Sequence, residues 1–310
     1  MYFGTPDFAV PALRALAASA HVLVGAVSQP DRPRGRGRAV EDTPVKRAAT
    51  ELGVDVLQPE KVGEDDALAW MRSREPELGV VVAFGQFIPK SVRELPRLGL
   101  INGHASLLPR WRGAAPIEWA IDAGDARTGV SVMRVVREMD AGDVCAARTL
   151  AIGPDDTAGD LTPRIADLTA QALVDAVDAL AAGTATWTPQ DPSRVTLAPK
   201  LDRDFAKLDF REPAERLLRR IRAATPRPGV DVELTRSAKR LHIVRARLGA
   251  PHGGAARPGA LRVESGRLLL AAGDAWLELT EIQLAGKRPM RAEELLRGFR
   301  VPDAEEARTP

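Results

Sequence analysis

Short apolar runs alternate with amphipathic helical patterns through the first half of the chain, and this alternation limits the folds that are open to it. The run at 78–84, Leu-Gly-Val-Val-Val-Ala-Phe, is apolar throughout, which is typical of a strand buried on both faces of a sheet. The runs at 1–3 and 21–27 flank a helical pattern that Thr5 could cap, and this order predicts a βαβ unit. We therefore expect an α/β domain built on a parallel sheet.

The last third of the chain has a different pattern. One helical segment, at 213–224, precedes five short alternating runs that are separated by glycine-rich turns. Strands of this kind predict a small β-barrel. The proline-rich segment before the helix is typical of a connection between domains. We therefore place a first domain at residues 1–186, a linker at 187–205 and a second domain at 206–310.

The overall composition is that of a soluble protein of two domains. The chain has 310 residues, of which 45% are hydrophobic and 28% are charged. Its apolar runs fall short of the roughly 18 residues that a membrane span needs, so we expect no membrane partner and a cytoplasmic location. The single cysteine, Cys145, excludes an internal disulfide framework and a multi-cysteine metal site, and we expect no bound metal ion.

Basic residues are concentrated in two places. Residues 206–310 contain 21 Lys and Arg against 14 Asp and Glu, although the whole chain has a net charge of only +2. The segment 29–46 carries four arginines spaced by proline and glycine, namely Arg32, Arg34, Arg36 and Arg38. Arginine on a flexible backbone can contact phosphates and base edges, which predicts a mobile basic loop that binds nucleic acid. The alternatives are an arginine-heavy composition without a partner and a solvated surface loop.

A polar triplet ends the apolar run that begins at Leu98. Residues i and i+2 of a strand share a face, so Asn102 and His104 would point the same way, and Gly103 would let a substrate approach the backbone. An amide donor beside an imidazole suits an acyl carbonyl that becomes a tetrahedral oxyanion. The alternative is a strand end whose polar side chains cap the following helix.

Two further groups of residues are expected at the same edge of the sheet. Phe84-Gly85-Gln86 and Asp140-Ala141-Gly142 also follow apolar runs, and open parallel sheets place their sites at the carboxyl ends of the strands. A carboxylate at 140 that faced the imidazole of His104 would fix its orientation. The sequence has no serine in an elbow motif and no histidine spacing typical of a metal site. The set therefore favours direct acyl transfer without a covalent enzyme intermediate.

Six segments, taken together, are similar to those of a known family. They are Gly-Thr-Pro-Asp-Phe-Ala, Gln-Pro-Asp-Arg-Pro, Val-Val-Ala-Phe-Gly, Asn-Gly-His-Ala-Ser-Leu-Leu-Pro-Arg-Trp-Arg-Gly-Ala-Ala-Pro-Ile, Met-Asp-Ala-Gly-Asp and Leu-Ala-Gly-Lys-Arg-Pro-Met. They closely resemble the methionyl-tRNA formyltransferase family, over almost the whole chain. The resemblance implies a Rossmann-like formyltransferase domain and a smaller C-terminal OB-like β-barrel domain. It also implies formyl transfer from 10-formyltetrahydrofolate to the amino group of methionine on initiator tRNA, by a chain that acts as a monomer.

The resemblance also implies roles for individual residues. Asn102, His104 and Asp140 occupy the positions of the catalytic triad, in which the first two would hold the oxyanion and the third would help to remove the amine proton. The positions expected to bind folate are Phe84, Gly85, Gln86, Phe87, Ile88, Pro89, Ser106, Leu107, Leu108, Pro109, Met139 and Gly142. Those expected to bind tRNA are Arg32, Arg34, Arg36, Arg38 and Lys200, of which Arg36 is the most telling.

Two other functions share parts of this pattern. A formyltetrahydrofolate hydrolase or a sugar-amine formyltransferase would use the same triad, but the arginine segment and the basic second domain argue against both. A non-catalytic RNA-binding protein would keep the basic residues and leave the triad without a role.

The start of the chain departs from the family. Family members have several apolar residues before the Gly-Thr-Pro motif, whereas this sequence has only Met1, Tyr2 and Phe3. We expect a form extended upstream by a few codons to be more stable, and equal melting temperatures of the two forms would contradict this expectation.

Overall fold

The computed structural model describes residues 1–34 and 39–310, and for Arg34 and Ala39 it describes the backbone alone. Contacts between residues divide the chain into two units, which we describe separately. Unit 1 contains Met1–Pro116, Arg127–Ala151 and Thr162–Pro199, and unit 2 contains Ile117–Ala126, Ile152–Leu161 and Lys200–Pro310. None of the helices in these described ranges is long and apolar enough to cross a membrane.

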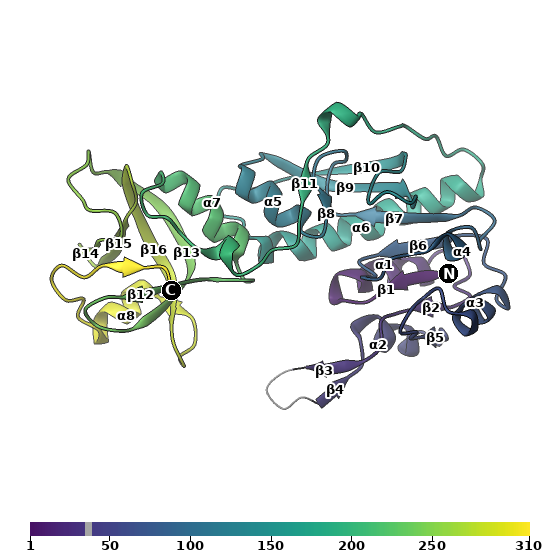
Figure 1. Cartoon of the computed structure of the whole chain (residues 1–310), viewed down its shortest axis with the longest axis horizontal. Helices are drawn as coiled ribbons and strands as arrows, with labels where there is room; N and C mark the ends of the chain where they lie inside the picture. The colour runs from purple at the N-terminus through teal and green to yellow at the C-terminus, as the bar shows by residue number, and fades with distance from the viewer. Residues whose placement is uncertain (35–38) are drawn as a thin grey trace. The chain divides into compact units, whose positions relative to one another are not determined.

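Within the described residues, a seven-stranded sheet forms the centre of unit 1 (Figure 1). Its order is β10-β9-β7-β6-β1-β2-β5, and the strands from β7 to β5 run parallel, as the sequence predicted. The chain moves from β1 outward to β2 and β5 and then adds β6 and β7 on the other side, which is the Rossmann order. β9 and β10 extend the sheet antiparallel. The strands are β1 (Tyr2–Gly4), β2 (Ala26–Val27), β5 (Val56–Leu57), β6 (Gly79–Val82), β7 (Leu100–His104), β9 (Arg127–Arg134) and β10 (Val144–Ala151).

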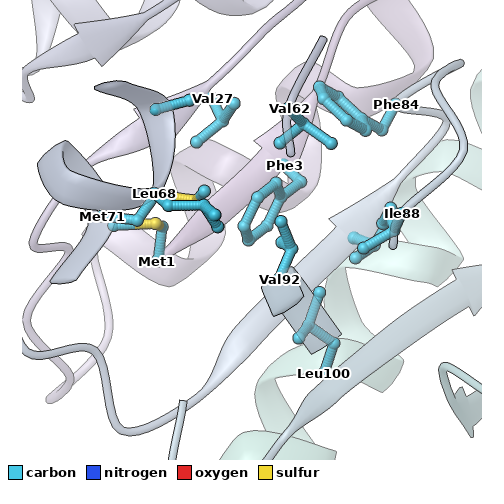
Figure 2. Close-up of a cluster of buried hydrophobic side chains, with 12 residues drawn as sticks. Met1, Phe3, Val27, Val62, Leu68, Met71, Phe84, Ile88, Val92 and Leu100 are labelled. Atoms are coloured by element: carbon cyan, nitrogen blue, oxygen red, sulfur yellow. The ribbon is translucent and has the colours of Figure 1, made fainter. Parts of the chain in front are cut away.

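Helices of unit 1 cover both faces of the sheet. Phe3 of β1 packs into a buried cluster with Leu68 and Met71 of α3, as Figure 2 shows. The neighbouring Tyr2 points to the opposite face, where its hydroxyl donates to the carbonyl of Ala9. Burial of each such side chain stabilises the fold by about 1.5–3 kcal/mol, so the short strand β1 is well anchored at the middle of the sheet. The helices are η1 (Asp7–Ala9), α1 (Val10–Ala17), α2 (Pro44–Glu51), α3 (Asp65–Arg72), α4 (Lys90–Arg93) and α6 (Ala158–Ala181).

The sequence predicted a mobile basic loop at the arginine-rich segment, and two short antiparallel strands form part of its described residues. Asp31 closes the base of this pair of strands. Its carboxylate accepts hydrogen bonds from the N–H of Thr43 at 3.0 Å and from Nε2 of Gln58 at 2.7 Å, and it pairs with the ammonium of Lys46. The carboxylate thus ties both ends of the insertion to the body of unit 1. The two strands are β3 (Arg32–Arg34) and β4 (Ala39–Glu41).

The segment that follows α6 is also tied to unit 1. Thr188 forms an antiparallel bridge with Val144, and Oγ1 of Thr196 accepts a hydrogen bond from the N–H of Trp111 at 2.9 Å. A short parallel pair of strands then joins this segment to the loop after β7. The elements are β8 (Arg112–Gly113), η2 (Pro192–Arg194) and β11 (Leu197–Ala198).

Unit 2 is a curled antiparallel sheet in the order β14-β15-β16-β13-β12-β18, with β17 beside β16 (Figure 1). A bridge between Ala260 and Glu306 joins the two ends of this order, so the sheet closes into the predicted barrel. Five of its strands match the five runs expected from the sequence. The strands are β12 (Val230–Leu234), β13 (Arg240–Pro251), β14 (Leu261–Glu264), β15 (Arg267–Ala271), β16 (Ala275–Leu284), β17 (Met290–Arg291) and β18 (Ala307–Arg308).

Helices and an ion-pair cluster complete unit 2. The carboxylate of Asp122, which is only 3% exposed, lies 2.7 Å from the guanidinium groups of both Arg216 and Arg220. This cluster ties α5 to α7 and explains why residues 117–126 group with the end of the chain. The helices are α5 (Pro116–Ala123), η3 (Asp204–Ala206), α7 (Ala214–Ala224) and α8 (Ala292–Gly298).

Candidate active site

His104 and Asp140 meet at the carboxyl end of β7. The imidazole Nδ1 lies 3.7 Å from Oδ2 of Asp140, and the two side chains are 7% and 14% exposed. The other ring nitrogen, Nε2, is 2.9 Å from the carbonyl oxygen of Trp111. A carbonyl oxygen can only accept, so Nε2 carries a hydrogen and Nδ1 is the nitrogen that faces the carboxylate. The structure therefore brings together two residues that the sequence placed at the ends of separate strands.

Asn102 and His104 share a face of β7, as the spacing predicted, but Gly103 has a different role from the one expected. A Cβ at Gly103 would lie 2.6 Å from Cγ2 of Thr169 and 3.0 Å from Cδ1 of Leu173. Gly103 therefore allows α6 to pack closely on the sheet, on the face opposite to the two polar side chains. The expectation that Gly103 lets a substrate approach is replaced by this packing requirement.

Asp140 is held in an unusual backbone conformation. Its φ of +52° lies in the left-handed region, which Asp and Asn tolerate better than most residues. Its Oδ2 accepts a hydrogen bond of 2.9 Å from the backbone N–H of Gly113. This contact directs the carboxylate toward the loop that follows His104, the last residue of β7.

The turn after β6 lies at the reversal of strand order in the sheet. The Phe84 carbonyl accepts hydrogen bonds from Oγ1 of Thr5 at 2.8 Å and from Nε2 of Gln29 at 3.0 Å. The sequence predicted that Thr5 would cap the following helix, but its hydroxyl fixes this turn instead, and that helix has no side-chain cap. Gly85 has a φ of +82°, and a Cβ there would lie 2.2 Å from Nε2 of Gln29, so only glycine fits.

The side chains expected to bind folate around this turn have different environments. Phe84 and Ile88 belong to the buried cluster of Figure 2, so their side chains anchor the turn to the hydrophobic core. The amide of Gln86 is occupied, because it accepts from the N–H of Val62 and donates to the carbonyl of Pro59, both at 2.9 Å. Gly85 is exposed and Pro89 is half-buried. Phe87 is 73% exposed and available to a ligand.

Hydrogen bonds within the loop after β7 fix its other expected folate residues. The hydroxyl of Ser106 donates to the carbonyl of Arg110 at 2.7 Å, and the hydroxyl of Ser131 donates to the carbonyl of Ser106 at 2.8 Å. The N–H of Leu108 in turn donates to the hydroxyl of Ser131 at 3.0 Å. Leu107, Leu108 and Pro109 are half-buried. The polar groups of this loop thus determine its shape.

Two expected folate residues flank Asp140. Met139 is 74% exposed, and Gly142 is buried. A Cβ at Gly142 would lie 2.0 Å from the carbonyl oxygen of Arg134, so the loop can pass the end of β9 only with glycine at this position.

Comparison with known proteins gives the family. The family described as "Formyl transferase" matches residues 1–177, and the one described as "Formyl transferase, C-terminal domain" matches residues 200–300. Proteins named methionyl-tRNA formyltransferase from Halorhodospira halophila and Acidiphilium cryptum are 44% and 45% identical to this chain. The matches cover 98% and 97% of this chain and 97% and 96% of those proteins. The chain belongs to the methionyl-tRNA formyltransferase family. As a member of this family it is a folate-dependent formyltransferase, as its sequence indicated.

Solved structures share the fold of this family member. WlaRD, a sugar 3N-formyl transferase, has a TM-score of 0.66 at 14% identity, and the match covers 93% of this chain and 97% of that one. HypX from Aquifex aeolicus, in complex with tetrahydrofolic acid, has a TM-score of 0.61 at 17% identity, over 98% of this chain and 50% of that one. At sequence identities this low, the similarity to these two structures shows a shared fold only.

The residues expected to bind tRNA are described in part. Arg32 is exposed, and its guanidinium lies 3.6 Å from the carboxylate of Glu60. Only the backbone of Arg34 is described, and Arg36 and Arg38 lie outside the described residues. Lys200 is exposed at the start of the last segment of unit 2. Among the described residues, no cluster of His, Cys, Asp and Glu could hold a metal ion.

Sequence reasoning missed two residues that contact the site. Gln29 holds the Phe84 turn, and Gln190 contacts the Asp140 loop through hydrogen bonds to the carbonyls of Asp140 and Gly142, both at 2.8 Å. Gln190 lies in a proline-rich segment without periodicity, so its neighbours in the sequence gave no signal. The role of the Gln190 side-chain amide becomes visible only when the structure shows its hydrogen-bond partners.

Proposed function

We propose that this formyltransferase moves the formyl group of 10-formyltetrahydrofolate to the amino group of the methionyl residue on initiator tRNA, giving formylmethionyl-tRNA for translation initiation. The observation that carries the proposal is the meeting of His104 and Asp140, 3.7 Å apart, beside Asn102 at the carboxyl end of β7. It is supported by relatives named for this activity that match nearly the whole chain.

The reaction requires one bond to form and one to break at the formyl carbon. The methionyl amine attacks this carbon, and the formyl oxygen becomes an oxyanion that the Asn102 amide and the His104 imidazole stabilise. Nε2 of His104 already donates to the Trp111 carbonyl, so Nδ1 is the ring nitrogen that faces the Asp140 carboxylate. The attacking nitrogen loses a proton with the help of Asp140, the bond to N10 of the folate breaks, and N10 takes up a proton.

The remaining expected residues divide between the two substrates. Exposed Phe87 and Met139 offer apolar contacts to the flat pteridine, while the other folate residues act through the shape of their loops. The arginines of the segment 29–46, with Arg36 the most important, contact the acceptor stem, and Lys200 and the basic second domain hold the rest of the tRNA. We assign residues 1–186 to catalysis and folate binding, 187–205 to the connection and 206–310 to tRNA binding. The enzyme acts as a monomer in the cytoplasm.

An acceptor assay tests the proposal. Purified enzyme is mixed with methionyl initiator tRNA, with the folate donor supplied or omitted, and formylmethionine is measured after the ester bond is cleaved. Parallel reactions offer an amino-sugar nucleotide or water alone as the acceptor. We expect formyl transfer only to the tRNA and only with the donor. Transfer to the sugar, or release of formate without transfer, would replace this function with one of its alternatives.

A further inference from the structure

Residues 187–199, which we call the strap, contact both the Asp140 loop and the loop that follows His104. We infer that Gln190, in the middle of this strap, is a positioning residue that holds Asp140 in its working orientation. The inference rests on the proposed role of Asp140 in formyl transfer. It adds a function to a segment whose sequence indicates only a connection between domains.

Gln190 uses its whole hydrogen-bonding capacity on these loops. Its Nε2 donates to the carbonyls of Asp140 and Gly142, both at 2.8 Å. Its Oε1 accepts from Nε and Nη2 of Arg112, at 3.0 and 2.8 Å. A primary amide has two N–H donors and two acceptor lone pairs, and here each has a partner. One side chain therefore joins the Asp140 loop to β8.

The Asp140 loop needs such support because of its conformation. A residue other than glycine is disfavoured at a φ of +52°, in the left-handed region, so neighbouring contacts must maintain this conformation. The two carbonyls that Gln190 binds belong to Asp140 itself and to Gly142, two residues later. Holding these carbonyls fixes the backbone of the turn, and with it the direction of the Asp140 side chain.

The strap also supports the Asp140 carboxylate through Gly113, the residue that donates a hydrogen bond to it. β11 of the strap pairs with β8, and a Cβ at Gly113 would lie 2.4 Å from the carbonyl of Ala198. The N–H of the same Gly113 donates to Oδ2 of Asp140 at 2.9 Å. At the start of the strap, the guanidinium of Arg134 lies 3.9 Å from the ring centroid of Trp187. The strap thus contacts both the backbone and the hydrogen-bond donor that orient Asp140.

A double-mutant cycle between Gln190 and Asp140 tests the inference. Gln190→Leu removes all four hydrogen bonds at similar size, and we expect it to lower kcat roughly 10- to 100-fold, because small displacements of catalytic groups have effects of this order. The KM values for methionyl-tRNA and for 10-formyltetrahydrofolate should stay within about twofold, since Gln190 is assigned no substrate contact. In an Asp140→Asn background, Gln190→Leu should lower kcat by less than about twofold, because residues that act as one unit are not additive.

Two more variants separate positioning from general stability. Gln190→Glu keeps an acceptor for Arg112, but its second carboxylate oxygen would face the two carbonyl oxygens and repel them. It should therefore lose kcat, while the ion pair that it forms with the Arg112 guanidinium offsets part of the lost stability. It also serves if Gln190→Leu does not fold. Ser193→Ala is the matched control in the strap, since its hydroxyl donates only to the exposed carboxylate of Asp191 in the contacts described, at 2.7 Å, and it should behave like the wild type.

The outcomes are distinct. Wild-type kcat in Gln190→Glu, or losses in Gln190→Leu and Asp140→Asn that multiply in the double variant, would overturn the positioning role while leaving the proposed function in place. Wild-type activity in Asp140→Asn alone would overturn the proposed role of Asp140, and the inference with it.

Discussion

At the scale of single residues, one hydrogen bond decides how His104 can work. The carbonyl of Trp111 accepts from Nε2, so Nδ1 is the ring nitrogen that faces Asp140. Trp111 presents this carbonyl from a left-handed conformation with a φ of +68°. The loop after β7 therefore fixes both the tautomer and the orientation of the His104 ring.

Asp140→Asn isolates the carboxylate. Asparagine tolerates the same left-handed φ, so the loop keeps its shape while the negative charge is lost. We expect kcat to fall roughly 10²- to 10⁴-fold while the affinity for tRNA changes little. Steady-state kinetics and a tRNA-binding measurement check this. Activity within twofold of the wild type would remove Asp140 from the mechanism.

Gly103→Ala tests the packing role assigned to this glycine. The new methyl group would meet Thr169 and Leu173 of α6, so we expect a loss of about 1–3 kcal/mol in the free energy of unfolding. Chemical denaturation measures the loss, and adding Thr169→Ser should recover part of it. Gly298→Ala is the control, since a Cβ there meets nothing within 4 Å. A loss of activity with full stability would instead favour the original expectation that a substrate approaches this backbone.

At the scale of elements, Asp31 sets the position of β3 and β4, the described strands of the arginine-rich segment. Asp31→Asn replaces the carboxylate that pairs with Lys46, and we expect the KM for tRNA to rise several-fold with little change in the KM for folate. The lost charge-assisted bonds should also cost about 1–3 kcal/mol of stability. Asp42→Asn is the matched control, because Asp42 contacts the same ammonium at 2.7 Å but is 52% exposed. Equal kinetic effects of the two variants would contradict a special role for Asp31.

Arg36→Ala tests the expected role of the arginine-rich segment in tRNA binding. Loss of one phosphate or base contact should weaken tRNA use and reduce the slope of log affinity against log salt by about one. The affinity for folate should not change. Binding titrations at several salt concentrations measure the slope. If formylation of tRNA and its salt dependence are both unchanged, Arg36 has no part in recognition.

At the scale of the whole molecule, unit 2 gathers chain segments that are distant in sequence, and Asp160 with Arg245 is one of the ties. Burial alone would raise the pKa of Asp160, but hydrogen bonds from Arg245 and Thr157 outweigh it and lower the pKa to about 2. The lowered pKa means that the stabilisation is complete above the ordinary Asp value near 4 and is lost as the pH falls toward 2. Since both side chains are more than a third exposed, we expect a contribution of about 1 kcal/mol.

Denaturation at pH 6 and at pH 2.5 measures this tie. The wild type should exceed Asp160→Asn in stability at pH 6, and the difference should shrink at pH 2.5. Asp303→Asn, at an exposed position, should show no such pH-dependent difference. An equal difference between wild type and Asp160→Asn at both pH values would contradict the assignment.

Local patterns in the sequence determined the parts of this protein that depend on neighbouring residues. The alternation of apolar runs with helical segments gave the parallel part of the sheet, the two-residue spacing put Asn102 and His104 on one face, and the short runs gave the barrel strands. These features follow from the periods of the strand and the helix. The motifs were specific enough to give the family as well.

Tertiary structure alone decided the contacts between residues far apart in the chain. It placed Asp140 against His104, tied Gln190 to the Asp140 loop, used the Thr5 hydroxyl to hold the Phe84 turn, and required Gly103 for the packing of α6. Such contacts depend on how the loops pack against the folded sheet, and the local periodicity of the sequence does not predict that packing. The sequence therefore determined which elements form and which chemistry they carry, whereas the packing of those elements decided which side chains orient the reacting groups.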